Sequence, residues 1–516
     1  MSQTATPNSK VTQPVAQASK GHPKGLYVLF ATEMWERYNY YGMRAILVLF
    51  MTKALLFDKA FASNLYGSYT SLVYLTPLVG GYISDRYWGN QRSIILGGLV
   101  MAIGEFVLFF CASLYKSAPD ISSVLFFTGL GLMIAGNGFF KPNISSMVGQ
   151  LYPKGDRRSD AAYTIFYMGI NVGGAIGPFL CGLVGDTGNP ADFKWAFLVA
   201  GIGMLLSVVV QRLFQAKYVK SPEGKPLGEV PANSPKKFSN PVYIVAGLLL
   251  FSAVLIGMLY IDAKVFSYLT YLLIASVIFI AFVIFSDKSL NIIERKRIGV
   301  IFIVAFFVIF FWSAFEQAGA SLTFFAEEQT QRNLGFFTVP ASWFQSLNSI
   351  FVVVFAPVFA WLWLKMGKRE PTSPFKMAMG LALLALGYLW IAFGVKNVGS
   401  GVKVSMIWLT GMYALHTWGE LSLSPIGLSL VNKLAPFKFA SLLMAVWFLA
   451  NAAANKLAGV LSALYPEAGK TTSFLGYHMS NLYDFFMLFV GMAGVASLIL
   501  FLLTKQLKKM MQVNVE

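Results

Sequence analysis

The first apolar run of the sequence carries six polar side chains at helical spacing. They are two carboxylates, two guanidiniums and two phenols: Glu33, Glu36, Arg37, Tyr40, Tyr41 and Arg44. At 3.6 residues per turn these positions form one stripe along a helix. Such groups can bind a charged solute, and a carboxylate beside a guanidinium can take up and release a proton.

Other ionisable residues interrupt later apolar runs and are candidate partners for this stripe: Glu105, Lys141, Glu316, Glu420 and Lys456. An ionisable group at bilayer depth costs at least a few kcal/mol, so the stripe must face a water-accessible cavity or opposite charges. Glu105 and Lys456 are isolated in their runs, which favours a purely structural pairing for them. His416 also lies in an apolar run, and we expect it to be a packed polar residue.

The composition indicates that lipid is the main solvent of the chain. Of 516 residues, 56% are hydrophobic and 12% are charged, against roughly a quarter charged in soluble domains. Apolar runs near the ~20 residues that cross a bilayer recur along the chain. We therefore predict an all-α integral membrane protein with fourteen transmembrane helices. They cover residues 26–52, 63–84, 92–115, 121–147, 159–184, 192–214, 240–262, 265–286, 297–325, 340–366, 373–394, 402–430, 438–464 and 480–505.

The formal charge of +17 would suggest nucleic acid as a partner if the chain were soluble. The basic residues, however, gather in alternate connections between the predicted helices, such as Arg86 to Arg92, Lys154 to Arg158 and Lys217 to Lys237. This asymmetry orients a membrane protein with its basic loops inside the cell. It predicts two cytoplasmic termini, and with the charge in the loops of a membrane protein we expect no nucleic-acid partner.

Six helices, then two, then six suggest two related halves with an inserted pair. The predicted segments are a disordered cytoplasmic tail (1–24), an amino-terminal six-helix bundle (25–214), a cytoplasmic linker (215–239), the inserted pair (240–290), a carboxy-terminal six-helix bundle (291–506) and a second tail (507–516). We expect the inserted pair to be dispensable for the chemistry. Cys111 and Cys181 lie in apolar runs and are expected to be small buried hydrophobic residues.

Between the second and third predicted helices, Gly81, Asp85, Arg86, Gly89 and Arg92 follow the pattern G-x3-D-R-x2-G-x2-R. This stretch resembles the signature loop of the major facilitator superfamily, in the position where that superfamily has it. The resemblance implies the fold of that superfamily. Asp85, Arg86 and Arg92 could pair across the helix junction at the cytoplasmic face, which would be a gating role.

Three longer motifs resemble the proton-coupled oligopeptide transporters, bacterial type. Residues 33–42, EMWERYNYYG, are similar to the family motif E-x-x-E-R-F-x-Y-Y-G, with Tyr38 in place of Phe. Residues 166–173, FYMGINVG, resemble F-Y-x-x-I-N-x-G, and residues 419–427, GELSLSPIG, resemble G-E-L-x-x-S-P-x-G. The resemblance covers nearly the whole chain, from about Gly25 to the last helix, and it implies a bacterial cytoplasmic (inner) membrane location.

The resemblance implies a symporter that imports di- and tripeptides with protons by alternating access, and no enzymatic activity. A peptide is a zwitterion, so Arg37, Arg44 and Lys141 could receive its carboxylate and Glu420 its amine. The resemblance adds hydrogen bonds from Asn171 and Asn348. It also implies a cavity lined by Tyr40, Tyr41, Tyr69, Tyr163, Trp312, Ser424 and Trp447.

Proton coupling is expected to involve Glu33, Glu36, Arg37, Arg44, Lys141 and Glu316. The family suggests that Glu316 pairs with Arg44 in one state and releases it when protonated. Mammalian members use a histidine in the second helix, and residues 63–84 contain none. Coupling should therefore depend on carboxylates, with the proton as the coupling ion and no cofactor or metal.

Three alternatives remain open at this stage: another solute for the same fold (nitrate, a sugar or a drug), a membrane-embedded enzyme, and a passive channel. The sequence shows no metal-ligand cluster, nucleophile elbow or phosphate loop, which disfavours an enzyme. Expected partners are small peptides and peptide-like molecules, protons and the lipid bilayer, with a monomer as the unit of function.

Overall fold

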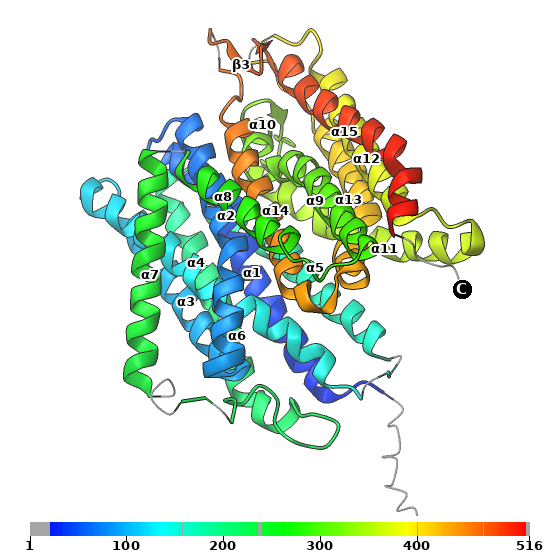
Figure 1. The fold of residues 1–516 in the computed structure, drawn as a ribbon. Coiled ribbons are helices and arrows are strands. Elements are labelled where there is room, and N and C mark those ends of the chain that lie inside the picture. The colour runs from blue at the N-terminus through cyan, green and yellow to red at the C-terminus, as the bar shows by residue number, and fades with distance from the viewer. Residues whose placement is uncertain are drawn as a thin grey trace, which may run out of the picture.

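The computed structural model of the chain describes residues 21–153, 155–156, 158–232, 234–235, 240–265, 267–399, 401–467 and 469–511. Most of the predicted amino-terminal tail lies outside these ranges, as do Lys154, Arg157, residues 236–239 of the predicted linker and residues 512–516. Within the described ranges the structure is almost entirely helical (Figure 1).

The amino-terminal half is a bundle of six helices. They are α1 (Lys24–Lys53), α2 (Lys59–Ile83), α3 (Asn90–Leu114), α4 (Pro119–Gln150), α5 (Arg158–Gly185) and α6 (Phe193–Tyr218). Helix α1 packs against α5 and α6, α3 packs against α4 and α6, and α2 packs against α4. All six agree with the predicted helices to within a few residues at each end.

The carboxy-terminal half contains α9 (Ile292–Phe315), α10 (Ser321–Glu328), α11 (Ser346–Met366), α12 (Ser373–Val395), α13 (Met406–Leu434), α14 (Ala440–Ser462) and α15 (Leu482–Met511). Two short sheets join its loops: β1 (Thr330–Gln331) with β2 (Val404–Ser405), and β3 (Thr472–Phe474) with β4 (Tyr477–Met479). Helix α15 extends six residues beyond the predicted end at 505.

One predicted helix, 297–325, is interrupted in the structure. Helix α9 ends at Phe315, a 3-10 turn spans Glu316–Gly319, and α10 continues toward the same side of the membrane. The turn lies against α2, because a Cβ at Gly319 would come within 1.7 Å of the Tyr66 hydroxyl. The predicted single span is confirmed, but it contains two α-helices joined by a 3-10 turn instead of one continuous α-helix.

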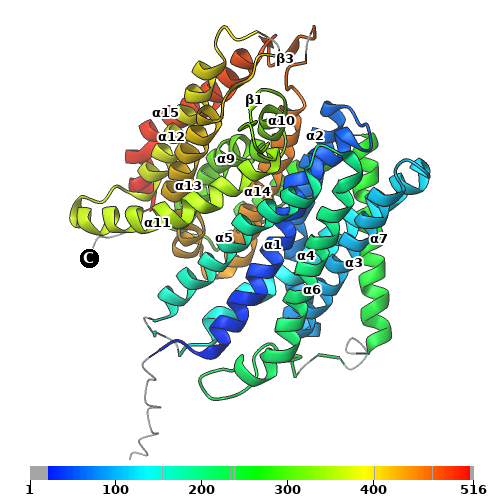
Figure 2. The ribbon, with the colours of Figure 1, turned by 180° about the vertical axis from the view of Figure 1, so that it is seen from behind.

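The inserted pair consists of α7 (Pro241–Lys264) and α8 (Tyr268–Phe285). Helix α7 packs along α4 and α2 of the amino-terminal half, whereas α8 packs against α14 of the carboxy-terminal half. Figures 1 and 2 show α7 at the outer edge of the molecule and the two halves side by side. The inserted pair therefore contacts both halves.

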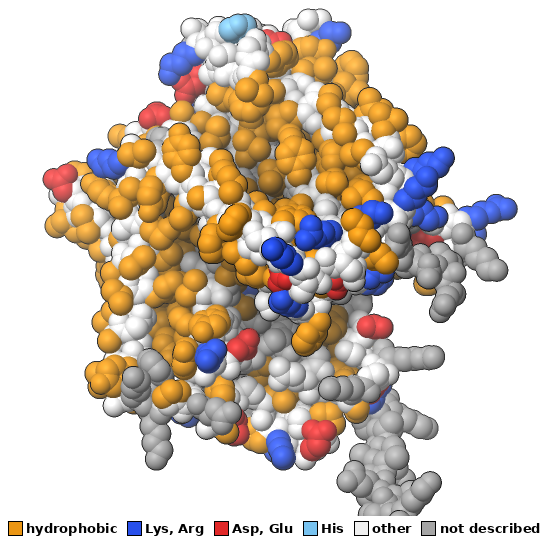
Figure 3. Space-filling view, in the orientation of Figure 1, with side chains coloured by type: hydrophobic (Ala, Val, Ile, Leu, Met, Phe, Trp, Pro, Cys, Tyr) orange, Lys and Arg blue, Asp and Glu red, His pale blue; other side chains and the backbone are white. Residues whose placement is uncertain are grey.

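Among the described residues, eleven helical segments are long and apolar enough to cross a membrane. Helices α1, α2 and α13 have comparable lengths but a more polar composition. Hydrophobic side chains cover much of the surface in Figure 3, which suits a surface solvated by lipid. The predicted fold class, an all-α membrane protein with two bundles and an inserted pair, is confirmed.

The strongest contacts between the halves lie at the end of the bundle where α1 ends and α2 begins, which we call the closed end. There α2 crosses α14, and α5 meets the start of α11. Two glycines permit the first crossing, because a Cβ at Gly67 would lie 2.7 Å from the Cα of Gly459.

Within the amino-terminal half, Gly80 permits the crossing of α2 and α4, because a Cβ there would lie 2.0 Å from the carbonyl oxygen of Gly138. We expect Gly80→Ala to lower the stability of the purified protein by about 1–3 kcal/mol, since backbone atoms would have to shift. Thermal unfolding in detergent measures this. The matched control is Gly257→Ala in α7, where a Cβ would meet nothing within 4 Å. If both variants melt like the parent chain, this packing argument is wrong.

Candidate functional site

The polar stripe of α1 faces the protein interior. Glu33, Glu36 and Arg37 are each at most 1% exposed. The Arg37 guanidinium donates to both carboxylate oxygens of Glu36, at 2.5 and 2.7 Å, and its Nε lies 3.3 Å from Oε1 of Glu33. One guanidinium therefore pairs with two buried carboxylates, which is the arrangement that a charged stripe in a membrane requires.

Glycines of α5 allow α1 to lie close enough for this arrangement. A Cβ at Gly173 would lie 2.2 Å from the carbonyl oxygen of Met34, and a Cβ at Gly177 would lie 2.4 Å from that of Tyr38. Both glycines belong to or follow the motif that begins at Phe166. Part of that motif thus has a packing explanation, the close approach of two helix backbones.

Arg44 forms the second ion pair of the stripe, and this pair crosses between the halves. Its Nη2 lies 2.6 Å from Oε2 of Glu316, and the side chains are only 8% and 5% exposed. Glu316 occupies the first position of the 3-10 turn that interrupts the span. The Arg44 guanidinium also lies over the rings of Tyr41 and Tyr66, at 5.6 and 5.9 Å from their centroids.

Glu420 lies on α13 in the carboxy-terminal half and is 8% exposed. The amide nitrogen of Asn348, on α11, donates to its Oε2 at 2.8 Å. The same nitrogen also lies 3.1 Å from the hydroxyl of Thr417. No basic side chain lies within ion-pair distance of Glu420 in the described part of the chain, so its charge is open to a cationic group of a ligand.

A cavity between the halves brings these groups together. The amino-terminal half contributes Tyr41, Arg44 and Tyr74, together with Gly174 and Pro178. The carboxy-terminal half contributes Trp312, Phe315, Glu316, Ala318, Gln345, Asn348, Ser349, Tyr413, His416 and Glu420. The cavity therefore has the Arg44 guanidinium in one half and the carboxylates of Glu316 and Glu420 in the other, a set of charges that suits a zwitterionic ligand.

Of the residues predicted to bind a peptide, five line this cavity: Tyr41, Arg44, Trp312, Asn348 and Glu420. Seven do not line it in this conformation: Arg37, Tyr40, Tyr69, Lys141, Tyr163, Asn171 and Trp447. The Tyr69 ring is fully buried, the Asn171 amide donates to the backbone of its own helix, and Trp447 packs against Gly427. The side chain of Ser424 lies outside the described part of the structure.

Lys141 stands apart from the ion pairs with which it was grouped. Its ammonium lies over the ring of Tyr74, 5.3 Å from the centroid, and Tyr74 lines the cavity. Within the described residues, no carboxylate oxygen lies within 4.0 Å of its nitrogen. The predicted cluster of four residues is therefore only partly formed. Arg37 contacts Glu33 and Glu36, whereas Lys141 forms no ion pair with either carboxylate.

Sequence reasoning did not assign several lining residues to the cavity, and for two of them a signal existed. Tyr413 and His416 precede Glu420 by seven and four residues, so all three share one face of α13. The imidazole of His416 also packs against the ring of Tyr388, with centroids 4.7 Å apart. Helical spacing from an assigned carboxylate could have identified both positions.

The predicted gating residues Asp85, Arg86 and Arg92 are all exposed, and no ion pair joins them in the structure described. The junction is held by uncharged groups. The hydroxyls of Ser84 and Ser93 are 2.7 Å apart, and the Asn143 amide donates to Ser84 at 2.8 Å. Partial burial raises the pKa of Asp85. The expected charge pairing at this junction is absent from this conformation.

Glu105 and Lys456 have the partners expected of structural groups. The Asn39 amide donates to Glu105 at 2.8 Å inside the amino-terminal bundle. Lys456 pairs with Asp262 at 2.5 Å. Within the described residues, no group of three or more His, Cys, Asp and Glu side chains could hold a metal ion.

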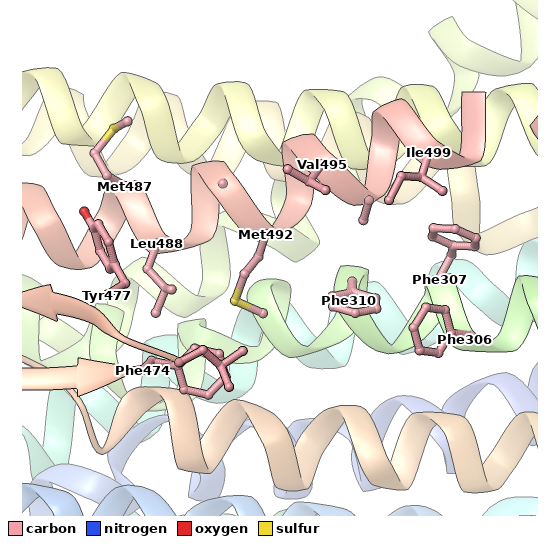
Figure 4. A pocket seen from close by; sticks show the side chains of 13 residues that line it. Phe306, Phe307, Phe310, Phe474, Tyr477, Met487, Leu488, Met492, Val495 and Ile499 are labelled. Carbon is pink, nitrogen blue, oxygen red and sulfur yellow. The ribbon is translucent and has the colours of Figure 1, made fainter. Parts of the chain in front are cut away.

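A second groove lies between α9 and α15, next to the β3–β4 hairpin (Figure 4). Its walls are apolar and aromatic, with Phe306, Phe310, Met492, Val495 and Ile499 among the residues that Figure 4 labels. It contains no charged side chain among its lining residues. A zwitterion would find no counter-charge there, so the cavity between the halves is the better candidate site.

Comparison with known proteins agrees with this geometry. The model of the POT family matches residues 91–477. The chain is 36% identical to the uncharacterized transporter YclF of Bacillus subtilis, with 88% of the chain and 90% of the relative covered. It is 34% identical to a di-/tripeptide transporter of Lactococcus lactis subsp. cremoris, with 87% and 90% covered.

Comparison with solved structures also indicates a transporter of this family. A mutant of the peptide transporter POT in complex with alafosfalin superposes with a TM-score of 0.80 at 33% identity, covering 96% of both chains. The fold and the site define a solute transporter with two helical halves. The chain belongs to the POT family, as the three motifs indicated. The matched family and these relatives are transporters, in agreement with the expectation of no enzymatic activity.

Removal of Arg37 would leave Glu33 and Glu36 buried without a cation. We expect Arg37→Met to lower the stability by about 3–5 kcal/mol, the usual effect of breaking a buried ion pair. The control is Lys470→Met, which removes one partner of the exposed Lys470 and Glu467 pair and should cost at most about 1 kcal/mol. Thermal unfolding of both variants measures the difference, and equal melting temperatures would contradict the assignment.

Proposed function

We propose that this protein is a symporter that imports di- and tripeptides together with protons by alternating access. Membership of the POT family supports the substrate class. The observation that carries the proposal is the cavity, which places Arg44 in one half opposite Glu420 in the other. The peptide carboxylate would pair with Arg44, helped by the nearby Lys141, and the amine would pair with Glu420.

This arrangement explains how one site can accept many peptides. The two charged ends are common to all peptides of a given length, whereas the side chains vary. Charged groups bind the ends, and Asn348 orients the carboxylate of Glu420. Aromatic groups such as Tyr41 and Trp312 provide walls without strict hydrogen-bond requirements. An anion carrier would have no need of a carboxylate in this wall.

We further propose that Glu316 carries the coupling proton. In the present conformation its charge pairs with Arg44 at 2.6 Å. Protonation would neutralise the carboxylate and release the guanidinium for the peptide carboxylate, so that proton and peptide move together. Each positive charge transported draws ~2.3 kcal/mol per 100 mV of membrane potential, enough for accumulation. Glu33, Glu36 and Arg37 would support a second step of the cycle.

The same proposal includes the cellular setting. The basic connections indicate that the termini lie in the cytoplasm of a bacterial cell, with the chain in the inner membrane. The closed end is then extracellular, and the conformation described is closed to the outside. The monomer would be the unit of function, since each chain contains a complete cavity between its own two halves.

The test of the function is uptake of a labelled dipeptide by proteoliposomes with an imposed proton gradient. We expect accumulation that an ionophore abolishes. Glu316→Gln should lose uphill uptake, because the amide cannot exchange a proton, while counterflow exchange without a gradient persists. Uphill uptake at the level of the parent chain would exclude Glu316 as the coupling group. A lack of any dipeptide-dependent flux in the parent chain would exclude the function itself.

Glu420 provides a separate test of the binding mode. We expect Glu420→Gln to raise the KM for a dipeptide by about 30-fold or more, because a buried charge pair with the amine is lost. The control ligand is the same dipeptide with an acetylated, uncharged amine. The Glu420→Gln variant and the parent chain should bind this ligand equally poorly. If Glu420→Gln transports the free dipeptide normally, the amine binds elsewhere.

A further inference from the structure

One buried ion pair lies outside the cavity. In the described residues, three sets of ion pairs have both side chains less than a tenth exposed. They are Arg37 with Glu33 and Glu36, Arg44 with Glu316, and Lys456 with Asp262. The first two belong to the α1 stripe. The third pair joins α14 to the last turn of α7, a helix of the inserted pair.

Asp262 contacts three different parts of the structure. Its Oδ2 lies 2.5 Å from Nζ of Lys456 on α14, and it accepts a hydrogen bond from the hydroxyl of Ser68 on α2. Lys456 also donates to the Ser68 hydroxyl, at 2.7 Å. Asp262, Lys456 and Ser68 therefore form one group, which we call the Asp262 junction. It contains one residue from each half and one from the inserted pair.

The second carboxylate oxygen of Asp262 fixes the inserted pair itself. Its Oδ1 accepts a hydrogen bond from the backbone nitrogen of Leu269 at 2.9 Å, in the first turn of α8. Asp262 thus holds the turn between α7 and α8 while it binds the two halves. Both oxygens of this buried carboxylate are engaged, as a buried charge requires.

The junction lies beside the tightest crossing between the halves. Ser68 follows Gly67, and Lys456 precedes Gly459 by one helical turn. Gly67 and Gly459 bring the backbones of α2 and α14 into contact, since a Cβ on either glycine would lie 2.7 Å from the Cα of the other. Any opening of the closed end must separate these two helices, and it must therefore separate Lys456 from Ser68.

The inserted pair cannot follow both halves when they separate. Helix α7 packs along α2 and α4, whereas α8 packs against α14. Asp262, at the end of α7, would stay with Ser68 and leave Lys456, or the turn between α7 and α8 would have to deform. Either way the contacts of a buried carboxylate are lost.

We infer that Asp262 stabilises the closed end by binding Ser68 and Lys456 together, so that the inserted pair sets the balance between the outward-open and the outward-closed states. This inference rests on the proposed alternating-access function. It gives the inserted pair a role in the conformational cycle, separate from peptide binding. Opening to the outside requires that the Asp262 junction dissociate, and closure re-forms it.

The test measures the conformational balance directly, without peptide or proton gradient. Spin labels are placed at Ala60, at the start of α2, and at Val402, between α12 and α13, both of which are exposed near the closed end. The native Cys111 and Cys181 are buried. We expect Asp262→Asn and Lys456→Met each to raise the ratio of long to short label distances by at least about tenfold, because the outward-closed state loses its ion pair.

The double variant Asp262→Asn with Lys456→Met leaves no buried charge unpaired. It should also raise the ratio of long to short label distances, and it replaces a single variant that fails to fold. The matched control is Asp287→Asn, because Asp287 directly follows α8 and pairs with Lys438 of the carboxy-terminal half, with no ion-pair partner in the amino-terminal half among the described residues. It should leave the distances unchanged. Folded variants at Asp262 and Lys456 with the distance distribution of the parent chain would overturn the inference. Since no transport is measured, this result is independent of the peptide uptake assay.

Discussion

A charge that leaves water for the bilayer needs an opposite charge, and this requirement governs the interior of the protein. Arg37 pairs with two carboxyl groups, Arg44 pairs with Glu316, and Lys456 pairs with Asp262. The first set lies within one half, whereas the other two join different parts of the chain. Charges that a soluble protein would place on its surface therefore become contacts between the helices of the interior. Glu105 and Glu420 each have an amide partner and no cation within ion-pair distance in the described residues, but only Glu420 of these two lines the cavity between the halves, which makes it suited to a ligand.

Backbone contact at glycines complements the ion pairs. Gly173 and Gly177 bring α5 against α1, and Gly67 and Gly459 bring α2 against α14. Lipid provides little hydrophobic drive for helix association, so close packing of small residues is a main source of attraction between helices. The first contact is within a half and keeps the α1 stripe in place. The second is between halves and must be reversible, and there the Asp262 junction adds a charged contact beside the glycines.

Much of this could be predicted from the sequence, because hydropathy and helical spacing are local properties. They gave the helix positions and the orientation of the α1 stripe toward the interior. What failed depends on distant residues. The 3-10 turn at Glu316–Gly319 lies against Tyr66 of α2, and local patterns in the sequence do not record that contact. Asp262 ends a predicted helix, and nothing local indicates that Lys456 is its partner. Tyr163 and Trp447 were assigned by resemblance, but membership of a cavity changes with the conformation, which no motif records.

The 3-10 turn at Glu316–Gly319 divides one membrane span into two rods. The outer rod, α10, has eight residues and so is about 12 Å long. Its far end carries Glu327 and Glu328, which pair with Lys53 and Lys59 of the opposite half. Helix α10 therefore connects the turn directly to those two ion pairs, and a change in the angle of the turn would change their geometry. Glu316 is the first residue of that turn, so its pair with Arg44 ties the junction of the two helices to the opposite half, and the pairs of Glu327 and Glu328 tie the far end of α10 to the same half.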